Sequence, residues 1–193
     1  MIYFKFPFDE KLYSTDENSG ENPISFYSFD GLERLDFGGK IIELNPENFN
    51  QTAISSEILT EDKSGFEAET KEEYLKNLEK VIAVIKEHQL PKLVYSRRKI
   101  FTDFEEINLK ESFNHLCQSY PNAFRYIFID NGNSWMGAFS EVLGKFSKKT
   151  YEFETMSLAG TLPVSENWSE KEIEEQKPVT SYIRNILNQY SEN

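Results

Sequence analysis

The sequence predicts an α+β fold, and two kinds of pattern support this prediction. Three segments combine a capping box with apolar residues at helical spacing, as expected for amphipathic helices. Short runs rich in β-branched and aromatic residues alternate with turn-forming residues, which indicates antiparallel strands. No internal repeat or low-complexity linker marks a boundary, so we expect one domain over residues 1–193, with a strand-rich segment at 1–66 and a second segment at 67–190.

The first predicted helix follows the strand-rich segment, in which residues 24–29 (ISFYSF) form a β-type run. Thr70 and Glu73 make its capping box, and the helical pattern ends before Pro91. Its apolar stripe comprises Tyr74, Leu78, Val81, Ile82 and Ile85. Residues 92–97 then predict a strand, because their side chains alternate between two faces.

The second predicted helix leads into a series of strands. Asn108 and Glu111 form its capping box, and Pro121 stops it. Its apolar stripe comprises Leu109, Phe113, Leu116, Cys117 and Tyr120. The β-type runs at 124–129 and 134–139 flank Asn131-Gly132, which supplies the positive φ angles of a tight hairpin. Further runs at 142–146 and 151–158 extend the pattern as an antiparallel meander.

The third predicted helix starts at a capping box formed by Ser169 and Glu172. Its expected buried side comprises Ile173, Val179, Tyr182, Ile183, Ile186 and Leu187. Pro178 lies inside the helix, where it removes a backbone donor, so we expect a kink there that could displace residues of the preceding turn.

Composition excludes several functional classes. The net charge of -12 and the lack of a basic cluster longer than residues 97–99 argue against nucleic acid as a partner. A single cysteine, Cys117, and two histidines leave no Cys-rich or His-rich metal centre. No apolar stretch has the length of a signal peptide core or a membrane span, so we expect a cytoplasmic protein without a membrane partner. No Gly-x-Ser-x-Gly, Walker loop or dinucleotide fingerprint is present.

Five short motifs follow one another in a specific order. They are PKLVYSR at 91–97, YPNAF at 120–124, WMGAFSE at 135–141, ETMSLAGT at 154–161 and EKEIEEQ at 170–176. In order and spacing they resemble the chorismate-utilising enzymes, which include isochorismate, salicylate, anthranilate and aminodeoxychorismate synthases. The resemblance implies part of that family's fold, in which antiparallel β-sheets face one another with helices packed outside.

The resemblance also implies a reaction on chorismate, and its closest match is isochorismate synthase, an isomerase that supplies precursors of menaquinone or siderophores. Lys92 matches the lysine that activates water in the isochorismate-forming members, where anthranilate synthases carry glutamine. Glu141 matches the glutamate that protonates the leaving hydroxyl, although the family's Ser-Pro-Glu reads Phe139-Ser140-Glu141 here. General acid–base work of this kind needs two titratable groups held apart.

Magnesium is the cofactor that the resemblance implies. Glu175 matches the family's magnesium ligand on this helix, and Glu172, one turn earlier, is the alternative or supporting carboxylate. The segment Ala159, Gly160 and Thr161 matches the stretch whose backbone amides surround a substrate carboxylate. Ala159 also argues against the aminodeoxychorismate branch, many of whose members have a nucleophilic lysine at this position.

Other interpretations of the same residues remain open. Lys92 and Glu141 can be polar residues at strand ends, and the acidic run at 170–175 suits the first turn of any helix. The enzymatic alternatives are salicylate or anthranilate synthase-like activity, and the alternative of another class is a non-catalytic binding module of the same fold. The second half of the family domain, with a further magnesium glutamate and a substrate arginine, has no counterpart here. We therefore expect this polypeptide to be weakly active or inactive alone and to self-associate or bind such a half.

Overall fold

The computed structural model describes residues 1–18, 20, 24–45, 69–97, 99–101, 107–130 and 133–190. The chain divides into two units that are described separately below. Unit 1 comprises Met1–Asp62 and Asp103–Ser140, and unit 2 comprises Lys63–Thr102 and Glu141–Asn193. Residues 1–62 of the expected strand-rich segment 1–66 thus share a unit with residues 103–140, while residues 63–66 belong to unit 2. No linker in the sequence signals this division, because it follows spatial contacts and not composition.

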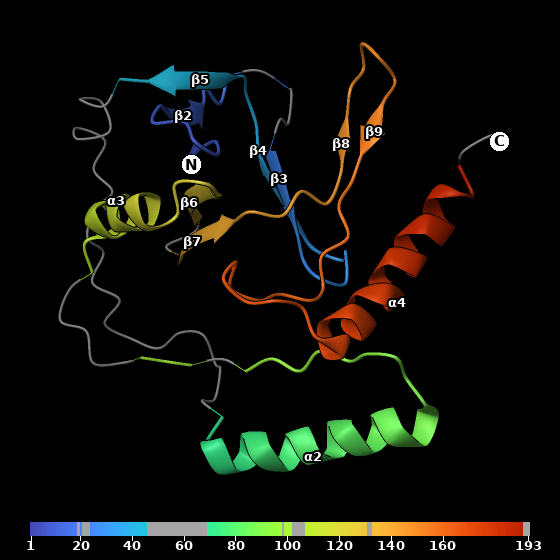
Figure 1. Ribbon diagram of the computed structural model, residues 1–193. Helices are drawn as coiled ribbons and strands as arrows, with labels where there is room; N and C mark the ends of the chain where they lie inside the picture. Colours follow the sequence, from blue (N-terminus) through green and yellow to red (C-terminus); the bar gives the residue numbers. More distant parts are fainter. Residues whose placement is uncertain are drawn as a thin grey trace. The chain divides into compact units, whose positions relative to one another are not determined.

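Unit 1 contains a five-stranded antiparallel sheet of order β5-β2-β1-β6-β7 (Figure 1). Its strands are β1 (Ile2–Lys5), β2 (Leu12–Thr15), β5 (Ile41–Leu44), β6 (Phe124–Asp130) and β7 (Asn133–Phe139). The N-terminal strand β1 lies at the centre, where it pairs with β2 on one side and β6 on the other. The predicted hairpin of β6 and β7 is confirmed as a strand pair, while its turn residues Asn131 and Gly132 lie outside the described residues.

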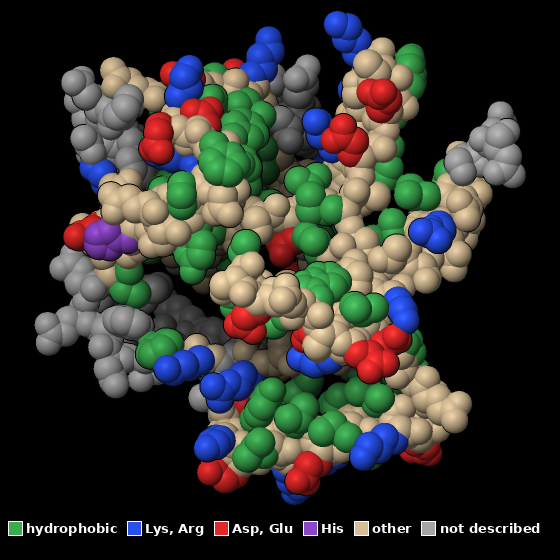
Figure 2. Space-filling model, in the orientation of Figure 1, with side chains coloured by type: hydrophobic (Ala, Val, Ile, Leu, Met, Phe, Trp, Pro, Cys, Tyr) green, Lys and Arg blue, Asp and Glu red, His purple; other side chains and the backbone are tan. Residues whose placement is uncertain are grey.

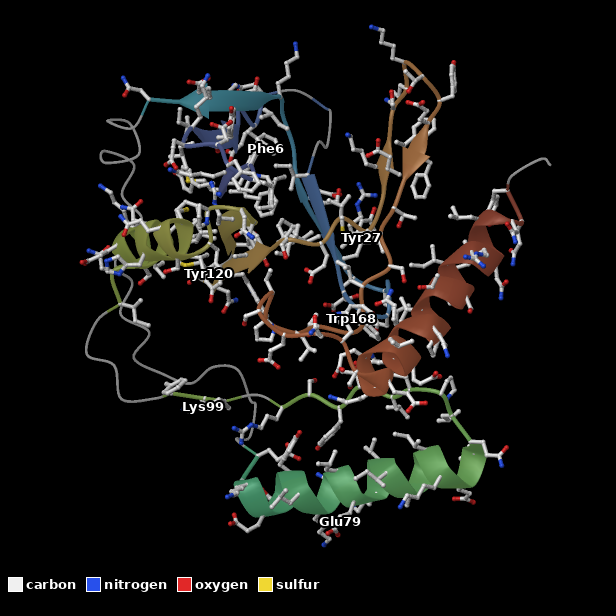
Figure 3. All side chains as sticks on the ribbon, viewed as in Figure 1. Phe6, Tyr27, Glu79, Lys99, Tyr120 and Trp168 are labelled. Carbon is white, nitrogen blue, oxygen red and sulfur yellow. The ribbon has the colours of Figure 1, made fainter. Side chains whose placement is uncertain are left out.

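Both faces of this sheet are covered. Helix α3 (Leu109–Ser119) lies on one face, where Phe113 packs with Tyr3, Leu12 and Ile127. The hairpin of β3 (Ile24–Tyr27) and β4 (Arg34–Phe37) contributes Phe37 and Phe26 to the other face, against Ile2, Phe4 and Phe128. Phe6, labelled in Figure 3, lies edge-on to Phe4 at the margin of this aromatic group. Successive residues of β1 therefore enter opposite cores, as the alternation of a strand requires.

The two N-terminal helix predictions are confirmed by the caps. Helix α2 (Lys71–His88) in unit 2 begins at Thr70, with both bonds of the capping box to Glu73 present. Its last residue is followed by Gln89 in the left-handed conformation (φ 49°), ahead of Pro91. Helix α3 begins at Asn108, whose side chain accepts a hydrogen bond from the Glu111 amide. Local side-chain chemistry thus fixes where each helix starts.

The predicted strand at residues 92–97 is wrong, since this segment of unit 2 is extended but joins no sheet among the described residues. Side chains of this segment contact two helices instead of neighbouring strands. The Tyr95 ring stacks on Tyr74 of α2 at 5.2 Å, and the Arg97 guanidinium lies over the same ring at 5.6 Å. Lys92 contacts α4 (Glu170–Leu187) through Glu175. The segment accordingly runs between α2 and α4 (Figure 1), and side-chain contacts replace the ladder hydrogen bonds.

The predicted meander after β7 is also corrected. Only the two-residue strands β8 (Lys145–Phe146) and β9 (Phe153–Glu154) form, and they pair with each other in a separate sheet of unit 2. Phe146, Tyr151 and Phe153 in this hairpin are all exposed. Without a covered face, only the residues nearest the turn pair, because an isolated two-stranded hairpin is marginally stable.

Helix α4 forms with the predicted capping box, but its covered side differs from the expected one. Ile173, Tyr182, Ile186 and Leu187 are exposed. Of the expected residues, Val179 and Ile183 are half-buried, as predicted, and they share the covered face with Gln176, which is also half-buried, and Glu172, which is buried. These four lie at spacings of four, three and four residues and therefore share one face. The face of α4 that packs within unit 2 begins with polar residues, which an apolar-stripe criterion does not detect.

Candidate functional site

The predicted site residues all belong to unit 2, and most of them meet at one turn of α4. This turn, residues 172–176, is called the 172–176 turn below. Three residues of this turn contact other parts of the chain, namely Glu175, Glu172 and Gln176.

Glu175 receives Lys92 from the extended segment. The Lys92 Nζ donates to Glu175 Oε1 at 2.9 Å, across 83 residues of sequence. The two side chains are 28% and 33% exposed, so solvent reaches both ends of the contact. The helix continues through Pro178 without interruption, and Glu175 one turn earlier keeps its place in the ion pair. The predicted base and the predicted magnesium carboxylate are therefore direct neighbours.

Glu172 acts as a helix-capping carboxylate. Its Oε2 accepts hydrogen bonds from the Ser169 backbone amide at 2.9 Å and from the Ser169 hydroxyl at 2.5 Å. These two hydrogen bonds, the hydroxyl first, lower the pKa of Glu172 below its ordinary value. The side chain is 7% exposed. Glu172 Oε2 already accepts two hydrogen bonds and is poorly placed to bind a metal ion as well, while Oε1 lies 3.7 Å from Lys171 Nζ. Capping is thus the role of Glu172 that the structure shows, and its magnesium role stays a prediction.

Gly160 packs against the backbone of Glu172. A Cβ atom added to Gly160 would lie 2.8 Å from the Glu172 carbonyl oxygen and 3.3 Å from the Glu172 Cβ. Only glycine allows this approach, because a side chain there would overlap rigid backbone. The predicted substrate segment is thus seated on the 172–176 turn by a close backbone contact.

Gln176 holds the same segment through its carboxamide. Its Oε1 accepts from the amides of Ala159 and Gly160 at 3.1 and 3.3 Å. Its Nε2 donates to the Ser157 carbonyl and hydroxyl, both at 2.7 Å, and to Thr180 Oγ1 at 3.2 Å. The EKEIEEQ motif contains Gln176 but does not predict a role for it. The available signal was its spacing of four residues from Glu172, which places both on one helix face.

Glu141 and Thr161 stand apart from these contacts. Both are exposed. In the part of the chain that the structure describes, no hydrogen bond or ion pair links either residue to Lys92 or to the 172–176 turn. The general-acid role of Glu141 and the substrate role of Thr161 remain predictions.

The donor set fits magnesium in part. Glu175 presents a half-exposed carboxylate of the hard oxygen type that Mg²⁺ prefers, whereas the buried Glu172 is committed to Ser169. Among the described residues no group of three or more His, Cys, Asp and Glu side chains is arranged to hold a metal ion. Of the two predicted ligands, Glu175 is the more accessible; its magnesium role stays a prediction, and one carboxylate alone is weak ligation.

A groove of about 330 Å³ adjoins the Gln176 contacts on α4. Its lining consists of Trp168, Ile173, Gln176, Lys177, Thr180, Ser181 and Arg184. Trp168 lies where the chain enters α4, as labelled in Figure 3. The groove shares Gln176 with the site but includes neither Lys92 nor Glu175.

Comparison with known proteins identifies the family. A family model described as "Chorismate binding enzyme" matches residues 40–193, which include every predicted site residue. No curated protein and no solved structure gives a significant match. The helices of the described ranges lack an apolar stretch of the length that a bilayer crossing requires. With most of its length matched by that family model, the chain belongs to the chorismate binding enzyme family.

Proposed function

We propose that the protein acts as an isochorismate synthase, which isomerises chorismate to isochorismate with the help of Mg²⁺. The observation that carries the proposal is the 2.9 Å contact between Lys92 and Glu175, beside the segment that contains Gly160. The family match supplies chorismate as the molecule acted on. The lysine at position 92 supplies the preference for isochorismate, as the family resemblance implies.

The proposed reaction moves a hydroxyl group between two ring carbons. Lys92 takes a proton from water as the water oxygen bonds to one ring carbon, and Glu141 gives a proton to the hydroxyl that leaves another. One water enters and one water leaves, so substrate and product are isomers. A proton acceptor and a proton donor on separate segments suit this chemistry, because each must approach a different ring carbon.

The ion pair sets a condition on this mechanism. In the contact with Glu175 the Lys92 nitrogen donates a hydrogen bond, whereas a base must offer a free lone pair. An ammonium group has no lone pair, so the mechanism requires Lys92 as a neutral amine, which can still donate one N–H to Glu175 while its lone pair accepts a proton from water. When bound, Mg²⁺ would supply positive charge next to a substrate carboxylate, and Glu175 is the residue of this unit that would hold it. The Glu175 carboxylate thus contacts the proposed base, Lys92, and would also hold the proposed Mg²⁺.

The test is to incubate the protein with chorismate and Mg²⁺ and to follow the products by chromatography. We expect slow formation of isochorismate, since the described carboxylates supply only weak magnesium ligation. Lys92→Met should reduce turnover roughly 100-fold or more, the usual effect of losing a general base. Lys76→Met removes an exposed lysine of α2 and should leave turnover unchanged.

Three results would contradict the proposal. One is an equal rate for Lys92→Met and Lys76→Met, which would remove Lys92 from the chemistry. Another is release of pyruvate with salicylate, or with anthranilate when ammonia is present, which would assign the protein to a different branch of the family. The third is a complete lack of chorismate binding by calorimetry, which would favour a non-catalytic module.

A further inference from the structure

The side-chain amide of Gln176 is held from both ends. Its oxygen faces two backbone N–H donors, from Ala159 and Gly160, and its nitrogen faces the Ser157 carbonyl and two hydroxyls. Rotating the amide by half a turn would place NH₂ against N–H donors and oxygen against a carbonyl. The donor and acceptor pattern therefore fixes one orientation of the amide.

The carboxamide also connects α4 with the segment that precedes it in sequence. Thr180 and Gln176 belong to α4, while Ser157 and the two amides belong to the segment that precedes it in sequence. The Thr180 hydroxyl lies 2.9 Å from the Ser157 hydroxyl and donates to the backbone carbonyl of Gln176 at 3.2 Å. Together with the close approach of Gly160 to Glu172, these bonds hold the segment against the turn that carries Glu175.

We propose that Gln176 is a positioning residue, which fixes the 157–160 segment relative to Glu175 and uses the amides of Ala159 and Gly160 for this purpose. In consequence these two amides are not the donors that meet the substrate carboxylate. The exposed Thr161, which follows them directly, is the residue of the predicted segment that is left to make this contact. The substrate part of this statement rests on the proposed function, while the positioning part does not.

The free energy of the Gln176 contacts favours a positioning role for this residue over a site in which a substrate carboxylate displaces it. If a substrate carboxylate took both amides, the half-buried Gln176 oxygen would lose both of its acceptor contacts. Leaving a partly buried polar atom without partners costs free energy that the incoming carboxylate would have to offset. A carboxylate that binds at Thr161 leaves the Gln176 contacts intact.

Amide hydrogen exchange by NMR tests the positioning role without any substrate. Gln176→Leu keeps a helix-forming side chain of similar size but removes both amide functions, so exchange at Ala159 and Gly160 should be about tenfold faster or more. Gln176→Glu keeps an acceptor for the two amides but sets a second oxygen against the Ser157 carbonyl, so it should restore only part of their protection. Asn185→Leu removes an amide from an exposed position of the same helix and serves as the control.

Chorismate affinity by calorimetry, at fixed Mg²⁺, tests the substrate part. We expect Gln176→Leu to weaken binding about tenfold, roughly the effect of losing one or two net hydrogen bonds that order the segment. Gln176→Glu should give an intermediate affinity, and Asn185→Leu should match the unmodified protein. The carboxylate that Gln176→Glu introduces can only accept hydrogen bonds. If Gln176 merely stabilised the fold, Gln176→Glu would not restore part of the chorismate affinity.

Each contrary outcome has a distinct meaning. Unchanged exchange at Ala159 and Gly160 in Gln176→Leu would overturn the positioning role. Tighter chorismate binding by Gln176→Leu would show that the amides are a substrate site from which Gln176 must be displaced, which overturns the proposal. If the unmodified protein binds no chorismate, the proposed function fails and the exchange result alone decides the role of Gln176.

Discussion

At the scale of single residues, Glu172 shows how one side chain can match two predictions while performing one function. The sequence predicts it both as a capping-box residue and as a carboxylate near magnesium. Its oxygen accepts two hydrogen bonds from Ser169, which is the capping function. The family motif and the capping box thus name the same carboxylate; its hydrogen bonds to Ser169 show the capping role, while its magnesium role stays a prediction.

The capping function makes a prediction about acid stability. Because folding lowers the pKa of Glu172, its contribution to stability is present above the ordinary glutamate pKa and is lost as the pH falls through the lowered one. Glu172→Gln should melt at a lower temperature than the unmodified protein near pH 7, and the difference should shrink as the solution is acidified. Thermal melts across this pH range test it, with the exposed Glu170→Gln as control. A constant difference at all pH values would contradict the prediction.

Gly160 provides a second prediction at this scale. Gly160→Ala places a Cβ atom 2.8 Å from the Glu172 carbonyl oxygen, and neither backbone can yield without moving the helix or the segment. We expect a loss of about 1–3 kcal/mol in the free energy of unfolding, typical of overpacking. Denaturant unfolding measures it. Gly20→Ala, which meets no atom within 4 Å, should be close to neutral.

At the scale of elements, the sequence predicts those parts whose signals are local. Thr70, Asn108 and Ser169 cap three helices as expected, because a capping side chain bonds to amides two or three residues away. The strand at 92–97 fails because alternation does not distinguish a neighbouring strand from a neighbouring helix. Its partners, Tyr74 and Glu175, lie at opposite ends of the described part of unit 2, so no short window contains both.

The candidate site is predictable to a similar extent. The motifs name Lys92, Gly160 and Glu175, all of which take part in contacts of the 172–176 turn. The role of Gln176 is not predicted, because it depends on where the 157–160 segment packs against α4, and this is a property of the tertiary structure. The expected apolar side of α4 is wrong in part for the same reason, since Val179 and Ile183 lie on the covered face but this face begins with Glu172 and Gln176.

The two-sided sheet of unit 1 leads to a prediction about its core. Phe113 is fully buried between α3 and the sheet, against Tyr3, Leu12 and Ile127. Phe113→Ala should cost about 3–5 kcal/mol, because removing a buried aromatic ring leaves a cavity that neighbours fill poorly. Denaturant unfolding, followed by probes in unit 1, measures the loss. Phe29→Ala, at a fully exposed ring, should change little and provides the matched comparison.

At the scale of the whole molecule, exposed apolar side chains and a large negative charge act against each other. Hydrophobic side chains gather along the face of α2 seen in Figure 2, with charged ones at its edge. Leu75, Ile82 and Val84 are exposed on this helix, and Tyr182 and Ile186 on α4. Contiguous apolar surface favours association, whereas the net charge of -12 makes copies of the chain repel one another.

Salt should therefore promote self-association. Raising the ionic strength from about 0.01 M to about 1 M shortens the screening length roughly tenfold, which weakens repulsion and leaves apolar attraction in place. Sedimentation velocity should show a shift from monomer toward larger species as salt increases. Ile82→Lys should reduce this shift, since it places a charge among the apolar side chains of α2. A decrease in association with salt would indicate that ion pairs, and not apolar contacts, join the copies.

The central position of β1 has a consequence for synthesis on the ribosome. Ile2 pairs with Phe128, so β1 leaves the ribosome more than a hundred residues before its partner strand β6. At bacterial or eukaryotic elongation rates of about 5–20 residues per second, this interval lasts on the order of ten seconds. During that time Ile2 and Phe4 lack Phe128, which later packs with them in one core. Pairing of β1 with β6 is therefore a late step of synthesis.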